Sequence, residues 1–285
     1  MSGSYRIGQL FKGRLDSYTV AKKVRDTIWL AKDQTGSPAV IKFARGNDTV
    51  RNERDILKRF QGHSHFIGQL KDEVEVPASS DPAIVLEYLE DDLLSASKKR
   101  PLTGKEIKYV SKQVLRALDL LHSAGYVHTD LKLDNVLVNY KNHDHDSGMP
   151  KTLSDIHLAD FGGTSHVNSQ ITKAGGNHWG ARLANTQLSD GEYELQILIQ
   201  QSKYFGPFPP KYVDLVRSDE IAMATIAYVL DTVESLTPFN MTTEREVSKA
   251  DKEFICKIMK IDPRDRPTAK ELLLDPWFEP GLELS

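Results

Sequence analysis

Hydrophobic periodicity changes along this chain of 285 residues. The first ninety residues carry short runs rich in β-forming side chains, whereas apolar residues after Thr103 recur at three- and four-residue spacing. Short runs of this kind are typical of strands, and the longer spacing is typical of helices. The sequence therefore predicts an α+β chain in which a small antiparallel sheet precedes a larger, mainly helical part.

Four runs in the first part are predicted to be strands and one segment a helix. The strands are 18–24, 27–31, 39–43 and 83–88, and the helix is 52–60. A Gly and a Pro between the second and third runs fit a turn, so an antiparallel meander is the simplest arrangement.

The second part is predicted to hold at least four helices. The longest, over 103–125, carries a strongly periodic apolar stripe and ends at Gly125, so we interpret it as a core helix. The other helical segments are 192–203, 218–233 and 248–259.

A polar segment, 139–151, is predicted to be a loop between two short strands. Its run His143, Asp144, His145, Asp146 has side chains that can bind a metal, but a solvated turn is the favoured interpretation.

Composition limits the class of protein. With 39% hydrophobic and 27% charged residues, the chain can bury a sizeable core as one large or two-lobed domain. A net charge of -3 provides no basic field, so neither nucleic acid nor a membrane surface is expected as a partner. The single Cys256 cannot form an internal disulfide, no apolar run approaches the ~20 residues of a membrane span, and Met1–Leu10 lacks the apolar stretch of a signal peptide. We therefore expect an intracellular protein of the cytoplasm or nucleus.

The strongest chemical signal is the run His128-Thr-Asp-Leu-Lys-Leu-Asp-Asn135, followed thirty positions later by Asp160-Phe-Gly. Transfer of a phosphoryl group needs an acid that orients the attacking hydroxyl, a lysine that offsets charge, and oxygen ligands for magnesium. Asp130, Lys132, Asn135 and Asp160 supply these groups in that order.

These two linked motifs resemble the catalytic loop and the start of the activation segment of eukaryotic protein kinases. The resemblance implies a two-lobed fold, with Asp130 and Lys132 as catalytic residues and with Asn135 and Asp160 holding Mg2+. Thr129 stands where most kinases have arginine, as it does in SR-protein-kinase-like and certain fungal kinase-like sequences. Because that arginine pairs with a phosphate in the family, its loss argues against control by phosphorylation of the activation segment.

Lys42 follows Val40-Ile41 in a predicted strand, as does the family lysine that contacts the ATP phosphates. Glu53, eleven residues later on a predicted helix, is its natural ion-pair partner. The alternative is a surface salt bridge without a nucleotide.

The resemblance also places the adenine site. Leu86 occupies the position that gates the back of the nucleotide pocket, and Glu87 and Leu89 lie in the hinge whose backbone binds ATP in the family. Asp91 or Asp92 is within reach of the ribose in this interpretation.

Downstream, 262–268 and 274–278 resemble late signatures of the same family, which extends the similarity from about Tyr18 to Phe278. We therefore expect a single kinase-like domain over 1–285. Its β-rich lobe would span about 18–89 and its helical lobe about 90–278.

The chain departs from the family pattern at the glycine-rich turn. Only Arg25-Asp26-Thr27 join Val24 to Ile28, without any glycine to let backbone N–H groups close over phosphates. We expect a shortened turn with weaker capture of ATP, or a plain hairpin without a nucleotide contact.

A second departure follows Asp160. Between Phe161 and Gly206 there is no proline, so the Ala-Pro-Glu triplet of the family is absent, and 175–180 stands where the next region should begin. The simplest account is a deletion near 175–205, either evolved or produced by a splice or gene-model error. Arg266, which matches the usual partner of that triplet, must then be exposed or paired elsewhere.

Together these features predict an ATP- and Mg2+-dependent protein serine/threonine kinase whose partner is a protein substrate with Ser or Thr. Serine/threonine specificity is inferred from Lys132 by resemblance. The alternative is a pseudokinase that binds nucleotide or serves as a scaffold, motivated by the two departures. An enzyme acting on a small molecule through the same fold is a weaker third hypothesis.

Overall fold

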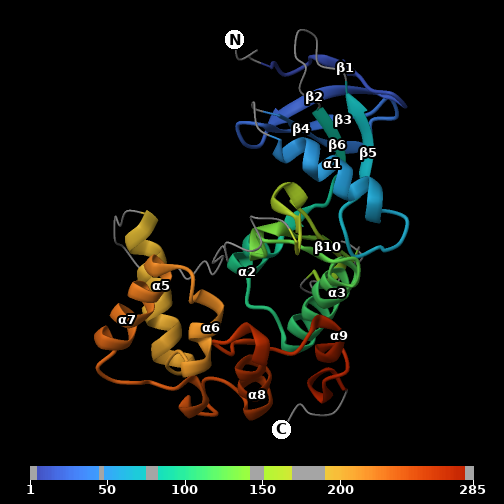
Figure 1. Ribbon diagram of the computed structural model, residues 1–285. Coiled ribbons are helices and arrows are strands. Elements are labelled where there is room, and N and C mark those ends of the chain that lie inside the picture. The colour runs from blue at the N-terminus through green and yellow to red at the C-terminus, as the bar shows by residue number, and fades with distance from the viewer. Residues whose placement is uncertain (1–4, 45–47, 75–82, 142–150, 169–189, 280–285) are drawn as a thin grey trace. The chain divides into compact units, whose positions relative to one another are not determined.

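The computed structural model describes residues 5–44, 48–74, 83–141, 151–168 and 190–279. The chain forms two compact units, 1–176 and 177–285. We describe each unit by itself, with the element labels of Figure 1.

A six-stranded antiparallel sheet opens the first unit, in the order β1-β2-β3-β4-β6-β5. The strands are β1 (Leu10–Lys12), β2 (Ser17–Lys23), β3 (Ile28–Lys32), β4 (Pro38–Phe43), β5 (Leu70–Val74) and β6 (Ala83–Glu87). The four predicted strands and their meander are confirmed. The sequence analysis missed β1, which has three residues, and β5, whose charged Lys71, Asp72 and Glu73 hide its alternation.

Helix α1 (Thr49–Phe60) confirms the predicted helix and begins three residues earlier than expected. Its buried face carries Val50, Ile56, Leu57 and Phe60, so it packs as an amphipathic helix. Glu53 lies on the same buried face. The helix therefore brings one carboxylate into an otherwise apolar contact surface.

The rest of the first unit joins helices to short strand pairs. It contains β7 (Asp91–Asp92), α2 (Leu93–Lys99), α3 (Gly104–Ser123), β8 (Tyr126–Val127), β9 (Val136–Tyr140), β10 (Leu153–Leu158) and β11 (Ser165–His166). Strand β9 lies between β10 and β7, and β11 pairs with β8. The core helix over 103–125 and the strands flanking the polar loop are confirmed. The run from His143 to Asp146 lies outside the described residues.

One apolar core joins these elements. Ile67, Leu121, Val138, Leu158 and Phe161 are each at most 1% exposed and belong to one cluster, which also takes in side chains of α1 and α2. Because α1, α3 and the β9–β10 hairpin share this core, the segments that follow β8 and β10 have firm supports.

The second unit is helical. It contains α5 (Asp190–Phe205), α6 (Val213–Val216), α7 (Glu220–Thr232), α8 (Lys249–Ile258) and α9 (Ala269–Leu272). Its three predicted helices are confirmed as α5, α7 and α8. The indole of Trp277 stacks on Phe254 at 4.1 Å and donates from Nε1 to Asp251 at 2.7 Å. The 175–180 segment lies outside the described residues.

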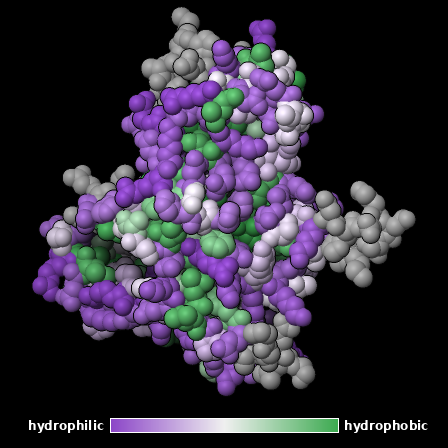
Figure 2. Space-filling model, turned by 90° about the vertical axis from the view of Figure 1, so that its right-hand side faces the viewer, coloured by the Kyte–Doolittle hydropathy of each residue, from purple (hydrophilic) through white to green (hydrophobic). Residues whose placement is uncertain are grey.

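Among the described residues, no helix has the length and apolar character needed to cross a membrane. The face drawn in Figure 2 is mainly hydrophilic, with apolar side chains in scattered patches.

A buried carboxylate ties the first two strands to β5. Asp72, 5% exposed, accepts N–H bonds from residues 14–16 at 3.0–3.1 Å and a hydroxyl bond from Tyr18 at 3.2 Å. Gly13 lies against this carboxylate, where an added Cβ would sit 2.1 Å from Oδ2. Residue 13 therefore has no room for a side chain.

We predict that Gly13→Ala destabilises the protein by about 1–3 kcal/mol, because the new methyl group displaces the Asp72 carboxylate. The urea midpoint of unfolding measures this. Gly104→Ala is the matched control, since a Cβ at Gly104 meets no atom within 4 Å. Equal midpoints for the two variants would contradict the prediction.

Glu106 closes the start of α3. Its carboxylate accepts two bonds from Arg100, at 2.8 and 2.5 Å, and forms a capping box with Thr103. The Arg100 bonds, with help from Thr103, lower the pKa of Glu106 to about 2. A folded-state pKa below the unfolded one stabilises the fold at pH values above the unfolded pKa, and this stabilisation is lost as pH falls from about 4.5 towards 2.

We therefore predict that the free energy of unfolding falls more steeply between pH 5 and 3 in the wild type than in Glu106→Gln, with a difference of about 2 kcal/mol. Denaturant titrations at several pH values measure it. Glu90→Gln, which removes an exposed carboxylate, is the matched control. A Glu106→Gln slope equal to that of the wild type would refute the assignment.

Candidate active site

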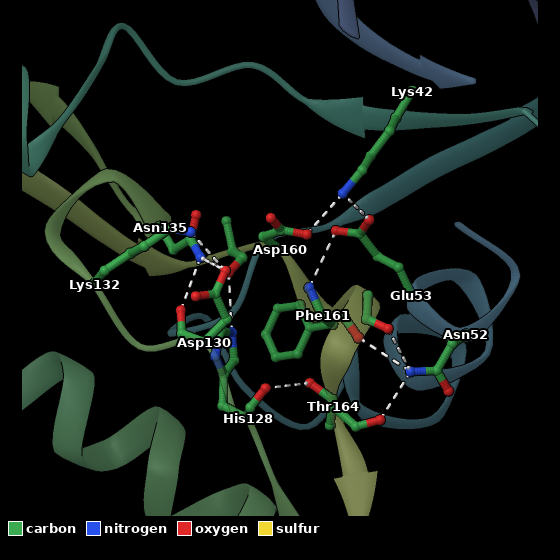
Figure 3. A network of polar contacts seen from close by, with 12 residues as sticks. Lys42, Asn52, Glu53, His128, Asp130, Lys132, Asn135, Asp160, Phe161 and Thr164 are labelled. Carbon is green, nitrogen blue, oxygen red and sulfur yellow. Dashed lines mark hydrogen bonds and ion pairs between the residues drawn. The ribbon is translucent and has the colours of Figure 1, made fainter. Parts of the chain in front are cut away.

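Lys42 forms a partly buried ion-pair network with two carboxylates (Figure 3). In β4 the alternation of side chains buries Ile41 and Phe43 on one face and turns Lys42 to the other. Its Nζ lies 2.6 Å from Glu53 Oε2 and 2.7 Å from Asp160 Oδ1. The side chain of Glu53 is 2% exposed. A sheet, a helix and the segment after β10 thus converge on one ammonium group.

Burial and charge act against each other in this network. Burial lowers the pKa of Lys42, but the carboxylates of Glu53 and Asp160 outweigh it and the net shift is upward. Burial raises the pKa of Asp160, yet Lys42 brings it below its ordinary value. Burial raises the pKa of Glu53, and Lys42 offsets only part of that. Lys42 is therefore cationic and Asp160 anionic at neutral pH.

Asp160 has a left-handed backbone, with φ 62° and ψ 68°. This region costs energy for a non-glycine residue and persists only where surrounding contacts hold it. Phe161, fully buried, packs edge-on against His128 at 5.1 Å and donates its N–H to Glu53 Oε1 at 3.3 Å. These contacts hold Asp160 in its strained conformation.

Asp130, Lys132 and Asn135 form a second polar group. Asp130 Oδ2 accepts from Lys132 Nζ at 2.7 Å and from Asn135 Nδ2 at 2.9 Å. The same amide nitrogen reaches the backbone O of Asp130 at 2.8 Å. Asn135 is buried, whereas the Lys132 side chain is 46% exposed. The structure therefore brings together the three residues predicted here, with their acid accessible from solvent.

His128 joins the two groups. Its Nε2 lies 3.0 Å from the backbone O of Ala159, and burial lowers the pKa of the imidazole. The neutral ring therefore carries its proton on Nε2 and donates it to this carbonyl. Asp160 follows Ala159 directly, so this bond fixes the strand end that presents the carboxylate.

The oxygen donors suit magnesium. Within the described residues no cluster of three or more His, Cys, Asp or Glu could hold a metal ion. Asn135 uses its amide nitrogen on Asp130, and Asp160 uses Oδ1 on Lys42, so the amide oxygen of Asn135 and Oδ2 of Asp160 are the oxygens that would hold a metal ion. Mg2+ commonly takes only one or two protein oxygens and completes its shell with phosphates and water.

The predicted hinge follows β6. Leu86 pairs with Val40 and packs against the main core, and Glu87 ends the strand with its N–H bonded to Gln69 O at 2.9 Å. Leu89 is buried at 6% exposure. Glu87 thus ends β6, and the adenine contact expected of this segment stays a prediction.

The two acidic residues after the hinge have structural partners. Asp91 Oδ2 accepts from Lys99 at 2.5 Å and from Tyr140 at 2.6 Å. Asp92 caps α2 through the N–H and hydroxyl of Ser95, each at 2.8 Å. Both carboxylates thus stabilise the fold. The expected contact of Asp91 or Asp92 with a ribose stays a prediction.

The turn between β2 and β3 is tight. The N–H groups of Val24 and Arg25 both donate to Ile28 O, at 2.9 and 3.0 Å. Lys23 closes the turn with an ion pair to Asp26 at 3.0 Å. The expected short turn is confirmed, and two of its N–H groups are already bonded within the hairpin.

Arg266 lies in the second unit. The sequence predicted that it is either exposed or paired with a group other than the family triplet, and the structure shows it paired. Its Nε donates to Lys260 O at 2.6 Å and its Nη2 to Ile261 O at 3.3 Å. Burial lowers the pKa of this guanidinium. Two backbone carbonyls therefore accept hydrogen bonds from the Arg266 guanidinium.

Sequence reasoning missed Asn52. Its side-chain amide donates to the backbone O of Phe161, Gly162 and Thr164 at 3.3, 3.0 and 2.8 Å. An amide next to Glu53 on the predicted helix was the available signal, but its partners lie about 110 residues away and only the tertiary fold reveals them.

Several characterised proteins are similar in sequence. The phosphorylase b kinase gamma catalytic chain, liver/testis isoform, of Mus musculus is 27% identical over 81% of this chain and 54% of its own length. Serine/threonine-protein kinase 33 of Bos taurus is 26% identical, over 90% and 51%. Mitogen-activated protein kinase HOG1B of Wallemia ichthyophaga is 28% identical, over 88% and 72%. The chain thus spans about half the length of the first two relatives. The particular likeness to SR-protein kinases stays a prediction.

The family assignment follows from the match to a domain family over more than half of the chain. The sequence pattern of the protein kinase domain matches residues 15–189, which is more than half of the chain. This range contains strands β2 to β6 of the sheet, α1, α3 and both polar groups of Figure 3. The curled antiparallel sheet and the helices that follow it agree with the two-lobed fold of that family. The chain belongs to the protein kinase family.

Proposed function

We propose that this chain is an ATP- and Mg2+-dependent protein serine/threonine kinase. The observation that carries the proposal is the ion pair of Lys42 with both Glu53 and Asp160, at 2.6 and 2.7 Å. In this arrangement a cation fixed by a buried carboxylate is held beside a second carboxylate that can face a metal. Such a pair suits a nucleotide whose phosphates carry magnesium.

Each group of the site has a role in this proposal. Lys42, kept in place by Glu53, binds the α- and β-phosphates, while Asn135 and Asp160 supply oxygen ligands to Mg2+. Backbone groups of Glu87 and Leu89 bind the adenine.

Asp130 orients the substrate hydroxyl. Its contacts within the described chain use Oδ2, which leaves Oδ1 to accept the hydroxyl proton. Lys132 reaches Asp130 and is exposed, so it can also offset charge on the transferred phosphoryl group. Lys132 is the residue on which serine/threonine specificity rests. The substrate class is a protein with accessible Ser or Thr.

The turn between β2 and β3 favours a second candidate, a pseudokinase that binds nucleotide without transferring phosphate. The N–H groups of Val24 and Arg25 bond to Ile28 O and are not free to contact phosphates. Phosphate capture then rests on Lys42 and magnesium. We rank this candidate second because the full set of catalytic side chains is present and arranged in two bonded groups.

The wider context of the kinase is part of the same proposal. The chain acts as a single domain, with a β-rich lobe over about 18–89 and a helical lobe over about 90–278. It works in the cytoplasm or nucleus, where ATP and protein substrates are available, and it requires neither nucleic acid nor membrane.

We predict that Asp130→Asn lowers phosphate transfer by about 100-fold or more while ATP affinity stays close to that of the wild type, because Asp130 acts on the hydroxyl. Asp160→Asn should weaken ATP binding in the presence of Mg2+, because it removes a metal ligand. Calorimetric titration with Mg2+ and ATP, together with radiolabel transfer to a basic protein, measures both effects.

Asp155→Asn is the matched control, since Asp155 is an exposed carboxylate that bonds Asn139 and Ser154. It should behave as the wild type does. Unaltered transfer in Asp130→Asn would refute the assigned role. ATP binding by the wild type without any transfer would favour the pseudokinase.

A further inference from the structure

The four backbone carbonyls that follow Asp160 are all held by two uncharged side chains. Asn52 Nδ2 donates to those of Phe161, Gly162 and Thr164, at 3.3, 3.0 and 2.8 Å. Thr129 Oγ1 donates to Gly163 O at 2.8 Å. Asn52 comes from α1 and Thr129 from the loop after β8, so the segment 161–164 is gripped by two separate elements, as Figure 3 shows for Asn52.

The contacts of position 52 require a side chain that donates hydrogen bonds. Backbone carbonyls accept hydrogen bonds and never donate them, so the amide nitrogen of Asn52 must face the segment. The amide nitrogen carries two N–H groups, so at least one N–H is shared between two of the three carbonyl oxygens. A carboxylate of the same shape would meet the carbonyl oxygens without a proton to offer and with a like charge.

Steric contact reinforces the grip. A Cβ added at Gly162 would lie 3.2 Å from Cβ of Thr49, and one added at Gly163 would lie 2.7 Å from Oγ1 of Thr129. A side chain at position 163 would therefore displace the Thr129 hydroxyl, and one at position 162 would be tightly packed against α1.

The gripped segment is continuous with the strained part of the site. Thr129 and Asp160 have φ values of 69° and 62° and are the positive-φ residues other than glycine in the described chain. We call the side chains of Asn52 and Thr129, which hold 161–164, the clamp. Thr129 is part of the clamp, and Asp160 directly precedes the segment that it holds. Strain of this kind persists only when surrounding bonds over-determine the backbone, and the bonds of Asn52 and Thr129 provide that constraint.

We propose that Asn52 and Thr129 are positioning residues, which hold 161–164 and thereby orient the Asp160 carboxylate for the metal-bound nucleotide. This inference rests on the proposed function. Both donors are neutral, so the orientation of Asp160 depends on no charged or phosphorylated group at these two positions. Asn52 acts beside Glu53 and Thr129 beside Asp130, and the clamp therefore joins the two polar groups of the site.

The test compares donors with near-isosteric residues that cannot donate. Asn52→Asp and Thr129→Val should raise the Mg2+ concentration for half-maximal ATP binding by about 10- to 100-fold, as is typical when the residue that orients a metal ligand is lost. Thr129→Ser keeps a hydroxyl and should stay close to the wild type. Asp55→Ala changes an exposed residue of α1 and should also leave the Mg2+ requirement unchanged.

A second readout does not require activity. Amide hydrogen exchange of 161–167 in the nucleotide-free protein should speed up in Asn52→Asp and Thr129→Val, and should match the wild type in Thr129→Ser and Asp55→Ala. If the wild type binds no ATP, the proposed function fails, while this exchange still decides whether the clamp exists. If Asn52→Asp does not fold, the Val and Ser pair at position 129 decides alone. Wild-type Mg2+ requirement and wild-type exchange in Thr129→Val would overturn the inference.

Discussion

The ion pair between Lys42 and Glu53 is the contact on which the site depends. Glu53 is almost completely inaccessible to solvent, and a carboxylate in such a place is costly unless a cation and hydrogen bonds compensate it. Lys42 and the N–H of Phe161 supply that compensation. The sheet, α1 and the segment after β10 must therefore keep their relative positions, because moving any of them would leave a buried charge unpaired.

The same constraint organises the polar groups around Lys42. Lys42 draws Asp160 towards the sheet, His128 holds the preceding carbonyl, and Asn52 holds the backbone that follows. Hydrogen bonds from the uncharged side chains of His128 and Asn52 thus support the ion pair of Lys42 and Asp160. At position 129, where the sequence resemblance places arginine in most kinases, the threonine hydroxyl donates to the backbone O of Gly163.

Much of the fold and of the site could be predicted from the sequence. Periodicity located α3 and the strands β2, β3, β4 and β6, and residue types in sequence order identified Asp130, Lys132, Asn135 and Asp160. Short or charged elements were missed, because three residues in β1 and the acidic run in β5 carry too little periodic signal. Asn52 was missed for another reason: an exposed-looking amide on a helix has no local property that names a partner.

The sequence by itself determined the order of the longer elements, the family and the chemical groups of the candidate site, because these depend on local periodicity and on residue types at fixed spacing. Tertiary structure alone decided which oxygens are engaged. It assigned Asp91 and Asp92 to structural bonds, closed the β2–β3 turn upon its own N–H groups, and set Asn52 against 161–164. The bonds of Asn52 to 161–164 and of Tyr140 to Asp91 join residues far apart in sequence, and only packing of the shared core brings them within hydrogen-bonding distance.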